Sequence, residues 1–192
     1  DPTVLVLGVE KMEPIMQVLQ AFQGKLDLTA FEFFSEKALS HVVEEKQLQR
    51  PFETEADFYA LIEFENNSEQ DMETAMNLFE TCLDEGWIVD GAISQNSTQA
   101  NNLWRLREDI SETISKFTPY KNDISVKVSK VPEFLQEVDS LVTSAYPNFE
   151  IIWFGHIGDG NIHLNILKPD ALAIEEFFEE CAKVSDLVFE IV

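Results

Sequence analysis

The residues best suited to chemistry lie in one short stretch, residues 155–165, which read Gly-His-Ile-Gly-Asp-Gly-Asn-Ile-His-Leu-Asn. An apolar run enters this stretch and an alternating apolar run leaves it, as in a β-hairpin. Asp159-Gly160 is typical of a two-residue hairpin turn, because both central residues of such a turn need positive φ. A turn at these residues would pair residue 156 with residue 163.

The two histidines of this hairpin, His156 and His163, would then stand directly opposite on one sheet face, with Cβ atoms about 4.5–5.5 Å apart. A divalent metal ion held about 2.0–2.1 Å from each imidazole nitrogen fits that gap. Asn165 lies two residues beyond and points to the same face. Two imidazoles do not complete a zinc site, and the sequence identifies no third ligand. A purely structural histidine pair is therefore the alternative.

A second candidate lies on a helical pattern near residues 98–117. At about 100° per residue, one sector of this helix is apolar, and Arg107 falls inside or beside it. The apolar positions of that sector are Leu103, Leu106, Ile110, Ile114 and Phe117. Because an unpaired buried charge is costly, Arg107 must meet an anion, and its planar fork suits a carboxylate. The alternative is an internal ion pair with one of the 36 acidic residues. Arg105 falls nearly opposite and is assigned to solvent.

Two further polar residues could help Arg107 to bind a small anion. Ser111 lies one helical turn later on nearly the same side and offers a hydroxyl donor. Lys121 lies between this helix and the next predicted strand, where it could supply a second positive charge or be an ordinary surface lysine. The surroundings are locally cationic, because six of the 13 basic residues but only four acidic ones lie between 105 and 130.

Composition places these candidates in a globular and strongly acidic chain. It has 192 residues, 45% of them hydrophobic, and a formal charge of −23. That charge argues against nucleic acid or an anionic membrane surface as the main partner. No apolar run approaches the roughly 18 residues of a membrane span. Cys82 and Cys181 lie far apart within helical patterns, which indicates a reducing compartment. We expect a cytoplasmic location, and peripheral attachment of the whole protein at the inner membrane is left open.

Strand-like and helical patterns alternate along the chain without a low-complexity linker. Strands are predicted near 3–9, 29–34, 58–65, 87–93, 123–129, 150–156 and 162–167. Helices are predicted near 11–23, 35–47, 68–85, 98–117, 132–145 and 171–191. Because a hairpin is mixed with helical crossovers, the pattern predicts an α+β fold with a mostly antiparallel sheet and helices packed on it. No Gly-x-Gly-x-x-Gly or Walker sequence indicates a nucleotide-binding fold.

Three spans carry a family resemblance. They are Leu-Trp-Arg-Leu-Arg-Glu-Asp-Ile at 103–110, Tyr-Lys-Asn-Asp-Ile-Ser at 120–125, and the histidine block at 155–165. In this order and spacing they resemble the C-terminal, substrate-side domain of FAD-linked 2-hydroxyacid dehydrogenases. This flavoprotein group includes D-lactate dehydrogenase, D-2-hydroxyglutarate dehydrogenase and the glycolate oxidase flavin subunit. Ala-Phe-Glu-Phe-Phe at 30–34 and Trp-Ile-Val-Asp-Gly-Ala at 87–92 also look like this family.

The resemblance covers nearly the whole chain and implies a ferredoxin-like, duplicated α+β domain that caps a separate FAD domain. Carried over by position, His156 and His163 match the ligands of a divalent metal ion, usually zinc. The implied partners are the FAD domain of the same protein and a small anionic 2-hydroxyacid, while a homodimer is left open. The implied reaction oxidises a D-2-hydroxyacid to a 2-oxoacid, with the metal polarising the hydroxyl group and hydride passing to the flavin.

The same resemblance assigns four substrate-binding positions. Arg107 and Lys121 match groups that bind the substrate carboxylate, and Ser111 matches a hydroxyl position beside them. Asn165 matches a polar substrate contact. We expect lactate to need one cationic partner and 2-hydroxyglutarate to need two, so the sequence leaves the choice of 2-hydroxyacid open.

One departure from the family pattern limits what residues 1–192 are expected to do alone. The family continues with a Ser-x-Glu-His-Gly-Ile-Gly segment, whose Glu completes the metal site and whose His is the expected base. The sequence ends at Val192, before such a segment, and holds no FAD domain, so we interpret it as a fragment of a larger protein. We assign no catalytic residue within it and expect it to be inactive alone. The alternatives are a stand-alone ferredoxin-like module that binds a metal or a small acid, and a purely structural domain.

Overall fold

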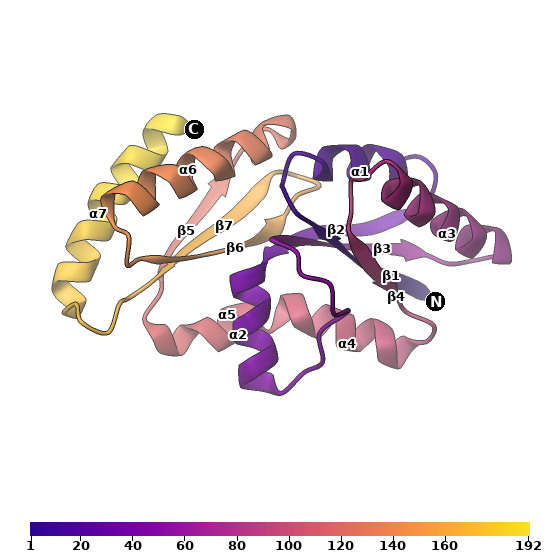
Figure 1. The fold of residues 1–192 in the computed structure, drawn as a ribbon, viewed down its shortest axis with the longest axis horizontal. Coiled ribbons are helices and arrows are strands. Elements are labelled where there is room, and N and C mark those ends of the chain that lie inside the picture. Colours follow the sequence, from indigo (N-terminus) through magenta and orange to yellow (C-terminus); the bar gives the residue numbers. More distant parts are fainter.

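The computed structural model describes residues 1–192 and contains one seven-stranded sheet (Figure 1). The strands are β1 (Pro2–Val9), β2 (Leu28–Ser35), β3 (Phe58–Glu65), β4 (Asp90–Ile93), β5 (Tyr120–Ser125), β6 (Glu150–His156) and β7 (Asn161–Leu167). Their order is β4-β1-β3-β2-β6-β7-β5, and every neighbouring pair is antiparallel. The predicted α+β class with an antiparallel sheet is confirmed.

Helices cover both faces of this sheet. The α-helices are α1 (Ile15–Phe22), α2 (Glu36–Lys46), α3 (Glu69–Asp84), α4 (Ser97–Glu108), α5 (Ile110–Ile114), α6 (Val131–Ala145) and α7 (Ile174–Ile191), with short 3-10 helices η1 (Ser115–Phe117) and η2 (Val128–Lys130). Helices α1, α3, α6 and α7 lie on one face, and α2, α4 and α5 lie on the other (Figure 1). None of the helices combines the length and apolarity that a bilayer crossing requires.

The sheet is built from two halves with the same strand arrangement. In the first half the order is β4-β1-β3-β2, and in the second half β5, β7 and β6 take the places of β1, β3 and β2. Helices α1 and α6 follow the first strand of each half, and α3 and α7 follow the third. This is the ferredoxin-like duplication that the resemblance implied. The second half has no counterpart of β4, so β5 has a single neighbour and forms an edge of the sheet.

Burial on both faces explains why the first strands read as continuous apolar runs. In β1, Leu5 and Leu7 belong to the core beneath α1, α3, α6 and α7, and Val4 and Val6 belong to the smaller core beneath α2, α4 and α5. No residue of β5 contributes to the smaller core. On that face the helical layer stops short of β5, where Lys121 is exposed, whereas Asn165 and Leu167 of the neighbouring strand β7 are buried.

The register of the β6–β7 hairpin differs from the prediction. His163 pairs with Phe154, and His156 pairs with Asn161, so the loop has four residues instead of two. The predicted direct opposition of the two histidines is therefore wrong. A shift of two residues nevertheless preserves the alternation of side chains, and both histidines remain on one face. The predicted turn fails because only Gly160 has positive φ, whereas the Asp159 carboxylate accepts a hydrogen bond from the backbone N–H of Asn161 (3.0 Å).

Two glycines of the histidine block are required by close backbone contacts. A Cβ at Gly155 would overlap the backbone oxygen of Asn161, across the hairpin. A Cβ at Gly160, where φ is +74°, would overlap the backbone oxygen of Val126. Gly160 in turn accepts a hydrogen bond from the N–H of Val126 (2.9 Å), so the hairpin tip is joined to the segment after β5.

Strand β5 also begins earlier than predicted, at residue 120 instead of 123. The alternating apolar residues Val126 and Val128 extended the predicted strand too far, because the chain leaves the sheet and enters η2 there. As a result Lys121, predicted to lie before the strand, lies within it and pairs with Asn165.

Both cysteines lie in helices, as predicted, and neither forms a disulfide. Burial raises the pKa of the Cys82 thiol to about 11 and that of the Cys181 thiol to about 12. Because the thiolate is the reactive form, both side chains behave as small core residues at neutral pH.

The close contact at Gly160 gives a stability prediction. Gly160→Ala must strain a backbone with φ of +74° and also displace Val126, whereas Gly24→Ala meets the same φ of +74° with nothing within 4 Å. We expect Gly24→Ala to lower the free energy of unfolding by about 1–2 kcal/mol, the usual strain for a non-glycine residue there. Gly160→Ala should cost clearly more in chemical denaturation of the whole protein. Equal losses would show that the Val126 contact contributes nothing.

Candidate functional site

The predicted site residues meet on the face that α2, α4 and α5 cover only in part. Strand pairing sets their positions, because Glu32 on β2 pairs with His156 on β6. One strand further, His163 on β7 pairs with Phe154 on β6 and with Asp123 on β5. Four strands thus contribute side chains to a single continuous patch.

The two imidazole rings lie next to each other, with centroids 5.7 Å apart and planes at 76°. The Nδ1 atom of His156 lies 2.6 Å from Oε1 of Glu32, and that of His163 lies 2.6 Å from Oδ1 of Asp123. Since a carboxylate can only accept, each Nδ1 carries the hydrogen and donates it. In the neutral imidazole the lone pair then lies on Nε2, which is the arrangement of metal-binding histidines.

Arg107 is buried, as its place on the helix predicted, and is 8% exposed. Its Cζ lies 4.8 Å from the ring centroid of Phe154, and its Nε lies 3.1 Å from Oε2 of Glu32. That contact is within ion-pair distance, but Nε is not aligned to donate a hydrogen bond. Burial lowers the pKa of Arg107, and the charge of Glu32 offsets part of that effect. The internal ion pair therefore exists, yet it runs through Nε and leaves the terminal fork available to an anion.

Glu32 and Asp123 were not identified from the sequence, although both contact predicted site residues. Glu32 is 5% exposed in the middle of the sheet and uses one oxygen for His156 and the other for Arg107. The sequence did hold a clue to Glu32, which is the single acidic residue in the apolar run at 30–34. A charge inside such a run is buried and needs partners. Asp123 had no comparable signal, since its side chain is exposed.

Phe154 packs between the two functional parts of the patch. Its ring contacts the Arg107 guanidinium on one side and lies 4.9 Å from the ring of His163, centroid to centroid. It thereby holds a cation and an imidazole against one apolar surface.

The remaining predicted residues lie around this cluster. Asn165 is 2% exposed, and its side chain is on the same face as the histidines. Lys121 pairs with Asn165 and is exposed on edge strand β5. Ser111 is exposed on α5, one turn after Arg107. The structure thus joins the two histidines to Arg107 through Glu32 and Phe154, with Lys121 beside Asn165 on the edge strand, whereas no contact joins Ser111 to this cluster.

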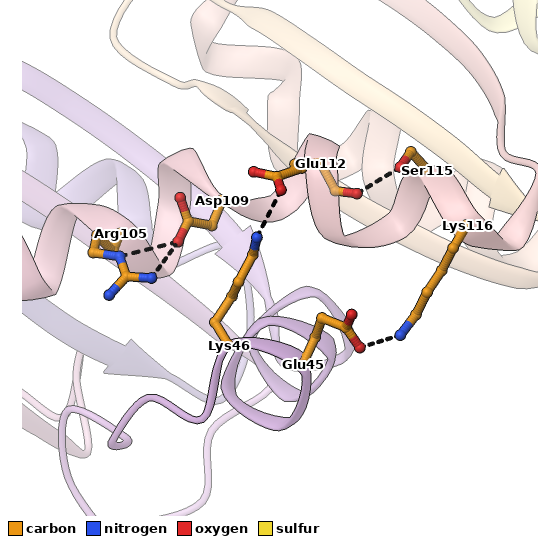
Figure 2. Close-up of polar contacts among 7 residues, drawn as sticks. All are labelled: Glu45, Lys46, Arg105, Asp109, Glu112, Ser115 and Lys116. Atoms are coloured by element: carbon orange, nitrogen blue, oxygen red, sulfur yellow. Dashed lines mark hydrogen bonds and ion pairs between the residues drawn. The ribbon is translucent and has the colours of Figure 1, made fainter.

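Contacts with β3 and α2 hold α4, which carries Arg107, and the helical segments that follow it. Trp104 donates from Nε1 to Glu63 on β3 (2.6 Å). On the surface, Lys46 of α2 pairs with Glu112 (2.8 Å), and Lys116 pairs with Glu45 (Figure 2). Because water screens such exposed pairs, they orient the helix more than they stabilise it.

Figure 2 also shows Arg105 bonded to Asp109 of the same helical segment, at 3.1 Å. Its side chain is 45% exposed, so the assignment of Arg105 to solvent is confirmed. Arg105 is therefore a natural control for experiments on Arg107.

No enclosed metal centre is formed by this chain. No group of three or more His, Cys, Asp or Glu side chains is arranged to hold an ion. His156 and His163 offer two Nε2 atoms as ligand positions for a divalent metal ion, which is fewer than the three or four protein ligands of a zinc site. A cavity of about 510 Å³ lies apart from the patch, between α4, β4 and the loop after α2, where Arg50 is already bound to Glu36.

Comparison with known proteins identifies the family. Residues 1–192 match the family described as FAD linked oxidases, C-terminal domain. A D-2-hydroxyglutarate dehydrogenase of Stutzerimonas stutzeri is 60% identical over 190 residues, covering 99% of this chain and 41% of that protein. A D-2-hydroxyglutarate dehydrogenase of Xanthomonas citri is 46% identical over 185 residues, covering 96% of this chain and 39% of that protein.

Among solved structures, an alkyldihydroxyacetonephosphate synthase shares the fold, with a TM-score of 0.64 and 12% identity, over 99% of this chain and 39% of that one. The chain spans about two-fifths of the length of these curated relatives. The chain belongs to the family of C-terminal domains of FAD-linked oxidases.

Proposed function

We propose that this chain is the substrate-side domain of an FAD-dependent dehydrogenase that oxidises D-2-hydroxyglutarate to 2-oxoglutarate. The observation that carries the proposal is the buried Arg107, whose guanidinium is not committed to an aligned hydrogen bond and shares a face with two imidazoles that have free Nε2 atoms. A guanidinium fork suits a carboxylate, and the relatives with the highest identities quoted above are D-2-hydroxyglutarate dehydrogenases.

The choice of a dicarboxylate rests on two separate cations. Arg107 is buried beside Phe154, and Lys121 is exposed on β5 opposite Asn165. In the proposal Arg107 binds one carboxylate, Lys121 binds the other, and the Asn165 amide contacts the polar atoms between them. Ser111, one turn after Arg107, is the remaining candidate hydroxyl donor. Orientation by such fixed charges lowers the barrier by holding the reacting carbon in place.

A divalent metal ion, zinc in the first instance, is part of the proposal, with His156 and His163 as two of its ligands. Their Nδ1 atoms are already committed to Glu32 and Asp123, which supports this role for Nε2. When bound, such an ion would polarise the 2-hydroxyl group of the substrate. The protein groups of the patch then orient the substrate and exclude water from it.

The rest of the proposed site belongs to the remainder of the protein. We propose that the FAD domain faces this patch and accepts the hydride, and that a Ser-x-Glu-His-Gly segment supplies the missing ligand and the base. The single neighbour of β5 supports a position for that segment beside Lys121, because β4 occupies the equivalent edge in the first half. The curated relatives are more than twice as long as this chain, which leaves room for both parts.

A stand-alone metal or small-acid binding module is not favoured. The family match spans residues 1–192, and its relatives are dehydrogenases rather than sensors. A purely structural domain does not account for a buried arginine whose only ion pair lacks hydrogen-bond alignment.

Arg107 can be tested in the whole protein with a dye as electron acceptor. Arg107→Met should lower kcat/KM for D-2-hydroxyglutarate by about 10–100-fold, the value of one or two charge-assisted hydrogen bonds. Arg105→Met removes a matched charge from the solvent side and should leave kcat/KM unchanged. Equal effects of the two substitutions would contradict a carboxylate-binding role for Arg107.

Lys121 can be tested by comparing substrates. Lys121→Met should lower kcat/KM for D-2-hydroxyglutarate by about 10-fold, because one charge-assisted hydrogen bond is lost. The residual activity with D-lactate, which has only one carboxylate, should change much less. A loss of the same size with both substrates would assign Lys121 to a shared part of the reaction instead.

The metal can be tested by removing it. Dialysis of the whole protein against a chelator should abolish most of kcat, and added Zn²⁺ should restore it. His163→Asn removes one proposed ligand, so this variant should need a higher Zn²⁺ concentration to regain its activity. A chelated, metal-free protein that kept full activity would rule out the metal.

A further inference from the structure

We propose that Glu32 is a positioning residue that couples the anion-binding group Arg107 to the cation-binding group His156. The proposal rests on the proposed function, because it assigns those two tasks to the two partners of one carboxylate. Oε1 of Glu32 lies 2.6 Å from Nδ1 of His156, and Oε2 lies 3.1 Å from Nε of Arg107. Each carboxylate oxygen of Glu32 therefore has its own partner.

The position of Glu32 is rigid. It lies on β2 between β3 and β6, and its own backbone pairs with Leu61 on one side and with His156 on the other. Only 5% of the residue is exposed, so water does not compete for its carboxylate. A buried carboxylate in the middle of a sheet fixes its partners more strictly than a surface carboxylate would.

The geometry of the Arg107 contact is not that of a simple structural ion pair. The most favourable arginine–carboxylate pair is bidentate and aligned. Here the closest approach of Glu32 is to Nε, without alignment, and Phe154 covers one face of the guanidinium. Glu32 thereby neutralises the charge of Arg107 and orients its guanidinium, while the two terminal nitrogens remain available to bind an anion.

The His156 contact has the complementary effect. Because the Glu32 carboxylate accepts from Nδ1–H, the ring is held in the tautomer whose Nε2 can bind a cation. Asp123 does the same for His163, at 2.6 Å, but it has no contact with Arg107. Glu32 therefore contacts both the arginine and a histidine, whereas Asp123 contacts a histidine only, so Asp123 serves as the control for Glu32.

The test uses the metal-free whole protein and two probes, Zn²⁺ and glutarate. Zn²⁺ affinity is measured by competition with a chromogenic chelator, and glutarate affinity by calorimetry. Glu32→Gln should raise the Zn²⁺ dissociation constant by about 10-fold or more, the usual cost of losing a carboxylate behind a metal-binding histidine. It should also raise the glutarate constant, because the Arg107 guanidinium loses the carboxylate that holds its orientation. Asp123→Asn should raise only the Zn²⁺ constant, and Arg105→Met should raise neither.

A folded Glu32→Gln protein in which only one constant changes, or neither does, would overturn the coupling. Because this substitution leaves Arg107 without its buried counter-charge, folding is checked by circular dichroism and thermal unfolding. If that variant does not fold, Glu32→Asp decides, since it keeps the charge but is too short to reach both partners. It should raise both constants, because the withdrawn carboxylate loses its wild-type contact with each partner, and a wild-type value for either constant would overturn the proposal. A wild-type protein that bound neither probe would instead contradict the proposed function itself.

Discussion

The organisation of the site depends on one buried carboxylate. Glu32 is placed in the middle of an antiparallel sheet, where an uncompensated charge is costly. That cost is met by Arg107 from a helix on the same face and by a hydrogen bond from His156 on the neighbouring strand. The requirement to neutralise Glu32 therefore brings a guanidinium and an imidazole together, although they come from distant parts of the chain.

The fold keeps this arrangement open on one side. Two ferredoxin-like halves join through β2 and β6, and this junction brings Glu32 beside His156. The helical layer of α2, α4 and α5 reaches β6 but shares no core contact with β5, so the His156 side chain stays 46% exposed and Lys121 is exposed on the edge strand. Gly160 allows the tip of the β6–β7 hairpin to lie against the segment after β5, because it has no Cβ to meet the backbone there. An open patch of this kind suits a site completed by a second domain.

Local patterns in the sequence were enough to predict most of the fold, because helix and strand periodicity report directly on burial. Helical periodicity placed Arg107 inside or beside the apolar sector, and the shared face of His156 and His163 was predicted from the hairpin pairing that Asp159-Gly160 implied. The hairpin register was missed by two residues, since the turn is formed by Gly160 with help from the Asp159 carboxylate and not by a two-residue loop. Side chains alternate between the two faces of a sheet, so a shift of two residues leaves each side chain on its original face. For that reason the predicted face of the two histidines was still correct.

Contacts between distant residues could not be predicted in the same way. Glu32 and His156 are separated by 124 positions, and Asp123 and His163 by 40. Such pairs depend on strand order and register, which no local pattern encodes. The family resemblance supplied roles for the histidines and Arg107, but it did not reveal the carboxylates behind them.

The central claim is that Arg107 and the two imidazoles bind parts of one ligand on a shared face. A crystal structure of the whole protein with D-2-hydroxyglutarate and zinc tests this most directly. The account predicts a substrate carboxylate within hydrogen-bond distance of both terminal nitrogens of Arg107, and zinc on Nε2 of His156 and His163. A substrate carboxylate bound elsewhere, with Arg107 turned fully onto Glu32, would contradict it.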